Sequence, residues 1–232
     1  MKIKIFCDSA DFKTLKKLNS NFLVKGFTTN PSLMRMVGAK NYKSYSKKIL
    51  SVCNKKPVSL EVFADSFDQM FRQATIINSW GKNVYVKIPV VNSRGFFSGK
   101  VIKKLSDKGI KLNITAVYTT NQVTKIINSV NKKSKTIISI FAGRMSDAGK
   151  DPVPIIKESV KKTKKFKNIS ILWASTREAY NFLQAKECGC QIITMPPDVI
   201  NKISNFGKSY KDLTLDTVKK FLEDSKRSKF TI

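Results

Sequence analysis

The sequence predicts an α/β protein that folds as a (β/α)8 TIM barrel. Short apolar runs of strand length alternate with amphipathic stretches along the chain, and this alternation indicates parallel βαβ units. There are eight such runs, which favours closure into a barrel over the alternative, a doubly wound open sheet. The absence of a GxGxxG or P-loop motif weakens that alternative further. The length of 232 residues suits one barrel.

The predicted strands are the apolar runs themselves. They are Ile3–Cys7, Phe22–Val24, Val58–Val62, Val84–Val90, Leu112–Val117, Thr136–Phe141, Ile169–Ala174 and Gln191–Met195. The amphipathic segments between them are predicted to be helices that cover the barrel. These are Asp11–Leu18, Tyr42–Val52, Ser66–Ser79, Gly99–Lys108, Asn121–Val130, Val153–Lys164 and Thr176–Lys186.

A final helix, Asp216–Ser225, is predicted after the eighth strand. Before that strand, Gly189 is expected to close the preceding helix as a C-terminal cap. No linker, low-complexity tract or domain boundary is visible. Residues 1–232 are therefore expected to form a single barrel domain with this C-terminal helix.

The composition argues against several classes of protein. No apolar run reaches 18 residues, so no membrane span is expected. The chain reaches Asp8 too early for a secretory signal, and its four cysteines form no CxxC pair, so we expect free thiols in the cytoplasm. Without histidine, Ser-His-Asp and Cys-His catalysis and histidine metal sites are excluded. Acid–base chemistry must then use Asp, Glu, Lys, Tyr or Cys.

The net charge of +28 allows two interpretations, a lysine-rich composition set by codon usage or a polyanionic partner. Only six of the 44 basic residues are arginine, the residue on which base and phosphate recognition most depends. The lysines are spread over the whole chain. Nucleic acid is therefore the less favoured partner, whereas the charge would help to steer phosphorylated substrates toward the protein.

Polar residues close seven of the eight predicted strands. In a (β/α)8 barrel the carboxyl ends of the strands form the active site. The residues concerned are Asp8, Thr28 to Ser32, Glu61, Lys87, Thr115, Ser139 with Arg144, and Ser175 with Arg177. Any one of them could be coincidental, but together they indicate a polar site at one end of the barrel.

Lys87 interrupts the apolar strand Val84–Val90. Burial would disfavour its charged form and lower its pKa, giving an amine that can attack a carbonyl and form an imine. The alternative is a lysine that extends out of the strand to reach solvent. Glu61 and Asp8 are candidates for the proton transfers of such chemistry, although Asp8 could equally cap a helix.

Arg144 and Arg177 both fall just beyond strands, where two guanidinium groups would suit a phosphate. Ser139 and Ser175 could add hydroxyl donors. Surface salt bridges are the alternative for each arginine.

These residues lie in segments that resemble the transaldolase family, which includes the short fructose-6-phosphate aldolases. The resemblance extends from Ile5 to about Pro197. It rests on Phe6-Cys7-Asp8, Thr28-Thr29-Asn30-Pro31-Ser32, Val86-Lys87-Ile88-Pro89-Val90, Asn113-Ile114-Thr115-Ala116-Val117-Tyr118 and Trp173-Ala174-Ser175-Thr176-Arg177. It implies a barrel with no metal and no organic cofactor.

The resemblance also implies a role for each matching residue. Lys87 matches the Schiff-base lysine, Asp8 the acid that handles the proton of the substrate C4 hydroxyl, and Asn30 the amide that binds substrate hydroxyls. Glu61 and Thr115 match the pair that holds a catalytic water. Ser139, Arg144 and Arg177 match the phosphate-binding group, while Ser32 and Ser175 match residues that line the pocket.

Two positions help to choose within the family. The aldolase branch carries Gln at the position of Glu61 and Tyr at that of Phe141, whereas the segment Ser139 to Arg144 resembles the transaldolase pattern Ser-Pro-Phe-Val-Gly-Arg. Ile140 and Ala142 depart from that pattern, which concerns substrate preference more than chemistry. The expected reaction is transfer of a dihydroxyacetone unit from fructose 6-phosphate or sedoheptulose 7-phosphate to an aldose phosphate.

The first alternative is an aldolase that releases free dihydroxyacetone, and a remote one is a basic protein that binds a polyanion. Short members of the family form pentamers or decamers in which the C-terminal helix packs on a neighbouring subunit. The resemblance therefore implies a homo-oligomer.

Overall fold

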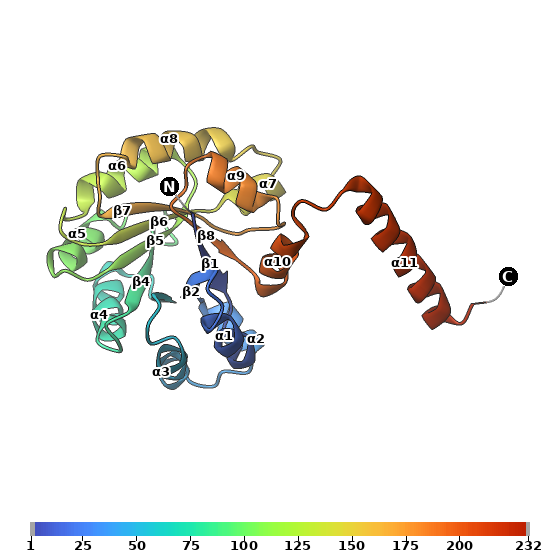
Figure 1. Cartoon of the computed structure of the whole chain (residues 1–232). Helices are drawn as coiled ribbons and strands as arrows, with labels where there is room; N and C mark the ends of the chain where they lie inside the picture. Colours follow the sequence, from blue (N-terminus) through green and yellow to red (C-terminus); the bar gives the residue numbers. More distant parts are fainter. Residues whose placement is uncertain (1–2, 231–232) are drawn as a thin grey trace. The chain divides into compact units, whose positions relative to one another are not determined.

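The computed structural model describes residues 3–230, and its main part is a closed barrel of parallel strands (Figure 1). The strands are β1 (Lys4–Asp8), β2 (Val24–Thr28), β3 (Val58–Glu61), β4 (Val84–Pro89), β5 (Leu112–Val117), β6 (Thr136–Ile140), β7 (Ile169–Trp173) and β8 (Ile192–Met195). They follow one another around the barrel in sequence order, and β1 pairs with β8 to close it. The predicted (β/α)8 fold is confirmed.

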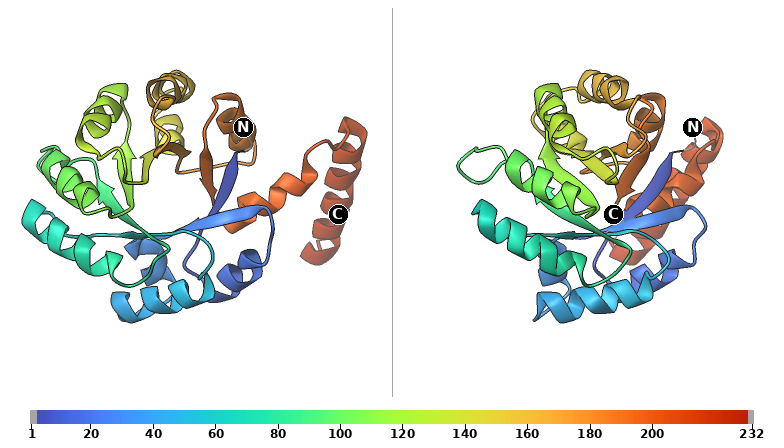
Figure 2. Two further views of the ribbon diagram at one scale, coloured as in Figure 1. Left: turned by 60° about the vertical axis from the view of Figure 1, so that its left-hand side comes forward. Right: turned by 90° about the vertical axis from the view of Figure 1, so that its left-hand side faces the viewer.

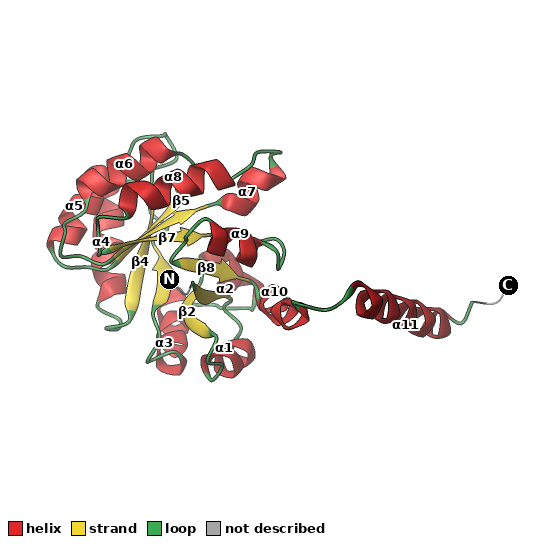
Figure 3. Cartoon of the chain, turned by 45° about the horizontal axis from the view of Figure 1, so that its top comes forward, coloured by secondary structure: helices red, strands yellow, loops and turns green. Residues whose placement is uncertain are grey.

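Helices cover the outside of the strands (Figures 2 and 3). They are α1 (Phe12–Asn19), α2 (Pro31–Met36), α3 (Tyr42–Val52), α4 (Phe67–Asn78), α5 (Gly99–Asp107), α6 (Thr120–Ser129), α7 (Ala142–Asp147), α8 (Val153–Thr163) and α9 (Asn181–Glu187). Polar caps start several of them. The Asp11 carboxylate accepts a hydrogen bond from the Thr14 N–H at 2.8 Å, and Asn30 caps α2 through the Leu33 N–H at 2.9 Å.

The interior of the barrel is apolar near its middle and polar at the carboxyl ends of the strands. A buried cluster, here called the barrel floor, contains Phe6, Ile137, Leu172, Ala174 and Ile192. Gly26 in β2 leaves room for the Phe6 ring, because a Cβ atom at position 26 would lie 2.6 Å from it. Phe6 also faces a cavity of about 840 Å³ at the amino ends of the strands, and Ala174 faces the carboxyl-end cavity. The floor thus lies between the two cavities.

The second strand differs from the prediction, which was wrong to place it at Phe22–Val24. β2 runs instead from Val24 to Thr28. The residues before it form a turn in which the Val24 N–H donates to the Asn21 carbonyl at 3.3 Å, and Phe22 is exposed. The apolar run was misleading because a lysine and a glycine occupy the centre of the true strand.

The helix predicted at Thr176–Lys186 begins only at Asn181. The preceding segment is held as a loop, because the Asn181 side-chain oxygen accepts hydrogen bonds from the N–H groups of Arg177 and Glu178. Short helices α2 and α7, which follow β2 and β6 directly, were not predicted. They carry residues of the carboxyl end of the barrel.

The chain divides into two compact units, of which the barrel ends at Ile200 and the second begins at Asn201. Helix α10 (Pro197–Lys202) spans this boundary, and the 3-10 turn η1 (Ile203–Asn205) follows. Helix α11 (Tyr210–Ser228) is longer than the predicted Asp216–Ser225, because Ser209 caps it through the Asp212 N–H at 3.1 Å. Inclusion of this helix in a single domain stays a prediction.

Two expectations from composition can be compared with the structure. The four cysteines are free and buried. Within residues 3–230 no helix combines the length and apolar character needed to cross a bilayer.

Candidate active site

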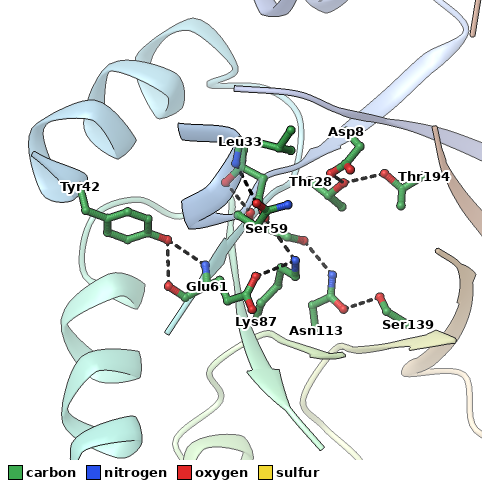
Figure 4. A network of polar contacts seen from close by, with 12 residues as sticks. Asp8, Thr28, Leu33, Tyr42, Ser59, Glu61, Lys87, Asn113, Ser139 and Thr194 are labelled. Atoms are coloured by element: carbon green, nitrogen blue, oxygen red, sulfur yellow. Dashed lines mark hydrogen bonds and ion pairs between the residues drawn. The ribbon is translucent and has the colours of Figure 1, made fainter. Parts of the chain in front are cut away.

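Lys87 points into the polar end of the barrel rather than out to solvent. It lies in β4 between Val86 and Ile88, and only 8% of its surface is exposed. Its Nζ lies 2.9 Å from Oε2 of Glu61 and donates a hydrogen bond to the Thr29 carbonyl at 3.2 Å (Figure 4). The alternative of a lysine that extends to solvent is therefore excluded by its position.

Glu61 ends β3 directly beside Lys87, because the two residues are partners in the β3–β4 register. A quarter of its side chain is exposed. Its main chain is held by the Tyr42 hydroxyl, which donates to the Glu61 carbonyl and accepts from the Glu61 N–H, both at 2.9 Å. The carboxylate is thus fixed within reach of the lysine amine.

Asp8 ends β1 and faces the same space. The Thr28 hydroxyl bonds the Asp8 carboxyl at 2.6 Å and shares a second hydrogen bond of 2.6 Å with Thr194. Burial raises the pKa of Asp8, and Lys87 and the Thr28 hydrogen bond only partly offset this effect. Asp8 does not cap α1, since Asp11 does. A carboxyl with a raised pKa can accept and return a proton more readily near neutral pH.

Asn113 links β5 to β3 and β6, and it was not singled out as a site residue from the sequence. This fully buried residue of β5 donates to the Ser59 hydroxyl at 3.0 Å and accepts from the Ser139 hydroxyl at 2.6 Å. The signal was available, because Asn113 lies two residues before Thr115 and so belongs to the same face of β5. Lys87 was singled out from the sequence for the same reason, because it is a polar residue inside an apolar strand.

Thr115 has an unused hydroxyl. Its Oγ1 is buried and has no hydrogen-bond partner among the described residues. The next residue, Ala116, has φ of 59°, and Ser175, two residues after β7, has φ of 63°. Left-handed backbone is rare for residues other than glycine, and such strain gathers at functional sites. An unpartnered buried hydroxyl at the same place can hold a water or a substrate atom.

A cavity of about 200 Å³ opens at this end of the barrel. Most of the predicted site residues line it: Asp8, Asn30, Lys87, Thr115, Ser139, Phe141, Arg144, Ser175 and Arg177. Glu61 contacts Lys87 without lining the cavity, and Ser32 is exposed at the start of α2. Within residues 3–230, no three His, Cys, Asp or Glu side chains gather as a metal site would require.

The two predicted arginines line this cavity in different states. Arg144, on α7, lies over the Phe141 ring with its guanidinium carbon 5.6 Å from the ring centre. Arg177 forms a two-pronged ion pair with Asp147, in which its Nε lies 3.1 Å from Oδ2. The hydrogen bond from Arg177 lowers the pKa of Asp147. Arg177 thus makes the exposed salt bridge that was the alternative interpretation for each arginine, although the sequence did not indicate Asp147 as its partner.

Comparison with known proteins places this geometry in context. The family model described as transaldolase/fructose-6-phosphate aldolase matches residues 5–232. A "Probable transaldolase" of Herpetosiphon aurantiacus is 32% identical over 202 residues, 87% of each chain. A "Probable transaldolase" of Thermoplasma volcanium is 34% identical over 231 residues, 97% of this chain and 96% of the relative.

Solved structures share the fold at low identity. Thiamine phosphate pyrophosphorylase from Pyrococcus furiosus has a TM-score of 0.56 at 9% identity, covering 84% of this chain and 85% of its own. Orotidine 5'-monophosphate decarboxylase from Metallosphaera sedula has a TM-score of 0.56 at 13% identity, covering 91% of this chain and 99% of its own. At this level of identity the likeness concerns the barrel alone.

Proposed function

The chain belongs to the transaldolase/fructose-6-phosphate aldolase family, and on that premise we propose that it is a transaldolase whose covalent nucleophile is Lys87. The observation that carries the proposal is the buried amine of Lys87, 2.9 Å from the Glu61 carboxylate in the polar end of the barrel. Across this contact a proton can pass from the ammonium group to the carboxylate. The neutral amine is then the nucleophile that imine formation requires.

The first half-reaction forms an imine on Lys87. The amine attacks the C2 carbonyl of fructose 6-phosphate or sedoheptulose 7-phosphate, and the carbinolamine loses water as Glu61 returns a proton. The unused hydroxyl of Thr115 supports the placement of that water. The protonated imine then accepts the electron pair of the C3–C4 bond, while Asp8 takes the proton of the C4 hydroxyl. An aldose phosphate leaves, and an enamine remains on Lys87.

In the second half-reaction the enamine attacks the aldehyde of an incoming aldose phosphate. Asp8 gives its proton to the new hydroxyl, and water releases the ketose from the imine. The raised pKa of Asp8 supports this role, because the same group must take up a proton in one half-reaction and deliver it in the other. No step needs a redox partner.

Substrate binding is assigned to the residues around this centre. Arg144 and Arg177 line the cavity and suit the phosphate, with Ser175 as a hydroxyl donor, whereas the Ser139 hydroxyl already donates to Asn113. The Asn30 side-chain oxygen is used to cap α2, so its amide N–H groups are the part left for substrate hydroxyls. The net charge of +28 would steer anionic sugars toward the protein.

We further propose that copies of the chain associate through α11. This helix buries none of its residues, and Leu215, Val218, Phe221 and Leu222 share one of its faces. An exposed apolar face of this kind gains free energy when a second surface covers it.

The test of the reaction is covalent trapping. Incubation with fructose 6-phosphate and borohydride should reduce the imine to a stable secondary amine, and peptide mass spectrometry should locate the adduct on Lys87. Lys87→Met should give no adduct and no transfer, while Lys100→Met, at an exposed lysine of α5, should behave as the parent protein does. An unmodified parent protein would contradict the proposal.

A coupled assay separates the two activities in the family name. A transaldolase should release little free dihydroxyacetone until erythrose 4-phosphate is added as acceptor. Release at an equal rate without acceptor would identify an aldolase instead.

A further inference from the structure

The ladder between β2 and β3 ends one step before Glu61. The two strands pair only at Phe27 with Val58 and at Thr28 with Ser59. The last main-chain bond runs from the Thr29 N–H to the Ser59 carbonyl at 3.1 Å. The next donor in a parallel ladder would be the N–H of residue 31, but Pro31 has none and begins α2. The Glu61 carbonyl is therefore left without a strand partner.

The Tyr42 hydroxyl takes the place of the missing strand. Tyr42 is the first residue of α3, and its hydroxyl donates to the carbonyl of Glu61 and accepts from the N–H of Glu61, both at 2.9 Å (Figure 4). Its ring packs edge-on against Phe63 at 5.3 Å and against Trp80 at 5.9 Å between ring centres. Burial raises the pKa of Tyr42, so the hydroxyl keeps its proton and can donate at neutral pH.

The hydrogen bonds between Tyr42 and Glu61 also leave the Thr29 carbonyl free to accept another donor. In a continued ladder the Glu61 N–H would donate to the Thr29 carbonyl. Because that N–H is bonded to Tyr42 instead, the Thr29 carbonyl is available and accepts from Nζ of Lys87 at 3.2 Å. One hydroxyl thus fixes the acid and leaves an acceptor for the amine.

We propose that Tyr42 is a positioning residue that aligns Glu61 and Lys87 without contacting the substrate. This inference rests on the proposed imine chemistry for its catalytic meaning. Without the hydroxyl, the Glu61 N–H competes with Lys87 for the Thr29 carbonyl, and the carboxylate and amine shift relative to each other. Misplacement of reacting groups by about 1 Å can slow a reaction roughly a hundredfold.

The chain contains a matched control. Tyr45 lies one turn later on α3, its hydroxyl donates to the Ala10 carbonyl at 2.9 Å, and its ring packs on Phe12 at 4.7 Å between centres. Tyr42→Phe and Tyr45→Phe each remove a hydroxyl bonded to the main chain and keep the ring. Tyr42→Phe should slow imine formation and kcat roughly ten- to hundredfold with KM nearly unchanged. Tyr45→Phe should stay within about twofold of the parent.

A second measurement needs no sugar. The rate at which a small amine-reactive ester labels Lys87 is followed by peptide mass spectrometry in the parent and both variants. Tyr42→Phe should label Lys87 several times faster than the parent, because the amine is no longer held by the Thr29 carbonyl, and Tyr45→Phe should not. Imine formation is still slower in Tyr42→Phe, because it also needs the aligned carboxylate of Glu61.

The outcomes of the two measurements are distinct. Equal labelling of Lys87 in all three proteins overturns the positioning role of Tyr42, whatever their transfer activity. Faster labelling in Tyr42→Phe together with no borohydride adduct in the parent supports the positioning role and contradicts the proposed function.

Discussion

Asp8 combines a buried carboxyl with hydroxyl partners, and its raised pKa has a consequence for stability. A carboxyl whose pKa is higher in the folded chain favours folding when protonated, so its contribution is present at low pH and lost as pH rises through the raised value. At neutral pH its ionisation therefore destabilises the fold. The site keeps an acid that the barrel would fold better without.

We expect Asp8→Asn to raise the melting temperature at neutral pH. The amide keeps an oxygen for the Thr28 hydroxyl and removes the buried charge. A gain of about 1 kcal/mol would shift the midpoint by roughly 2–4 °C in a chain of this size. The gain should shrink as the pH falls through the raised pKa of Asp8, because the carboxyl of the parent protein then becomes protonated.

Asp11 provides the opposite control. Hydrogen bonds from Thr14 lower the pKa of Asp11, so its contribution is present at neutral pH and lost in acid. Asp11→Asn should leave the melting temperature unchanged or lower it slightly. A lower melting temperature for Asp8→Asn at neutral pH, measured by calorimetry, would contradict the account of Asp8.

At the scale of elements, α7 and the loop after β7 meet at a single glycine. A Cβ atom at Gly143 would lie 1.6 Å from the Ser175 carbonyl oxygen, and Ser175 itself has φ of 63°. Arg144 follows directly on α7. The close approach of these two backbones thus sets the position of both an arginine and a serine of the site.

Gly143→Ala should force these elements apart. Overpacking of this kind destabilises proteins by about 1–3 kcal/mol, and here it should also raise KM for phosphorylated sugars by displacing Arg144. Denaturant unfolding and steady-state kinetics measure the two effects. Ser146→Ala, at an exposed position on the same helix, should change stability by less than about 0.5 kcal/mol. Unchanged stability in Gly143→Ala would refute the contact.

The elements also show where sequence reasoning succeeds. Seven of the eight strands lie close to their predicted places because each lies within a mostly apolar run, and Lys87 was recognisable as a charged residue inside such a run. β2 was misplaced because Lys25 and Gly26 stand at its centre. The reason for a glycine there, the packing of the Phe6 ring against it, is visible only in the structure. Tyr42 could not be recognised from the sequence, where it is simply the first residue of an amphipathic helix. Its role depends on the missing N–H of Pro31, a residue of another helix.

At the scale of the whole molecule, the exposed apolar face of α11 leads us to expect association between copies. Phe221 is 67% exposed and Leu222 is 57% exposed. The parent protein should sediment as an assembly well above the 26.2 kDa of one chain. Replacement of both residues by glutamate should shift it toward the monomer, because charges would face the neighbouring subunit.

Lys220→Glu tests whether added negative charge alone has this effect. Position 220 lies about 200° around the helix from Val218, on the side opposite the apolar face. This variant should keep the assembly of the parent. A parent protein that sediments as a monomer would remove the proposal.

The barrel floor determines how molecules can reach Lys87. Phe6, Ile137 and their neighbours lie between the site and the amino ends of the strands, so molecules that enter the site and molecules that leave it share the opposite opening. In the proposed reaction the first aldehyde has to vacate this single passage before the second can enter. The chain would then spend part of every cycle with a fragment bound to its lysine and no partner in the pocket, because the apolar floor leaves the two aldehydes one shared route.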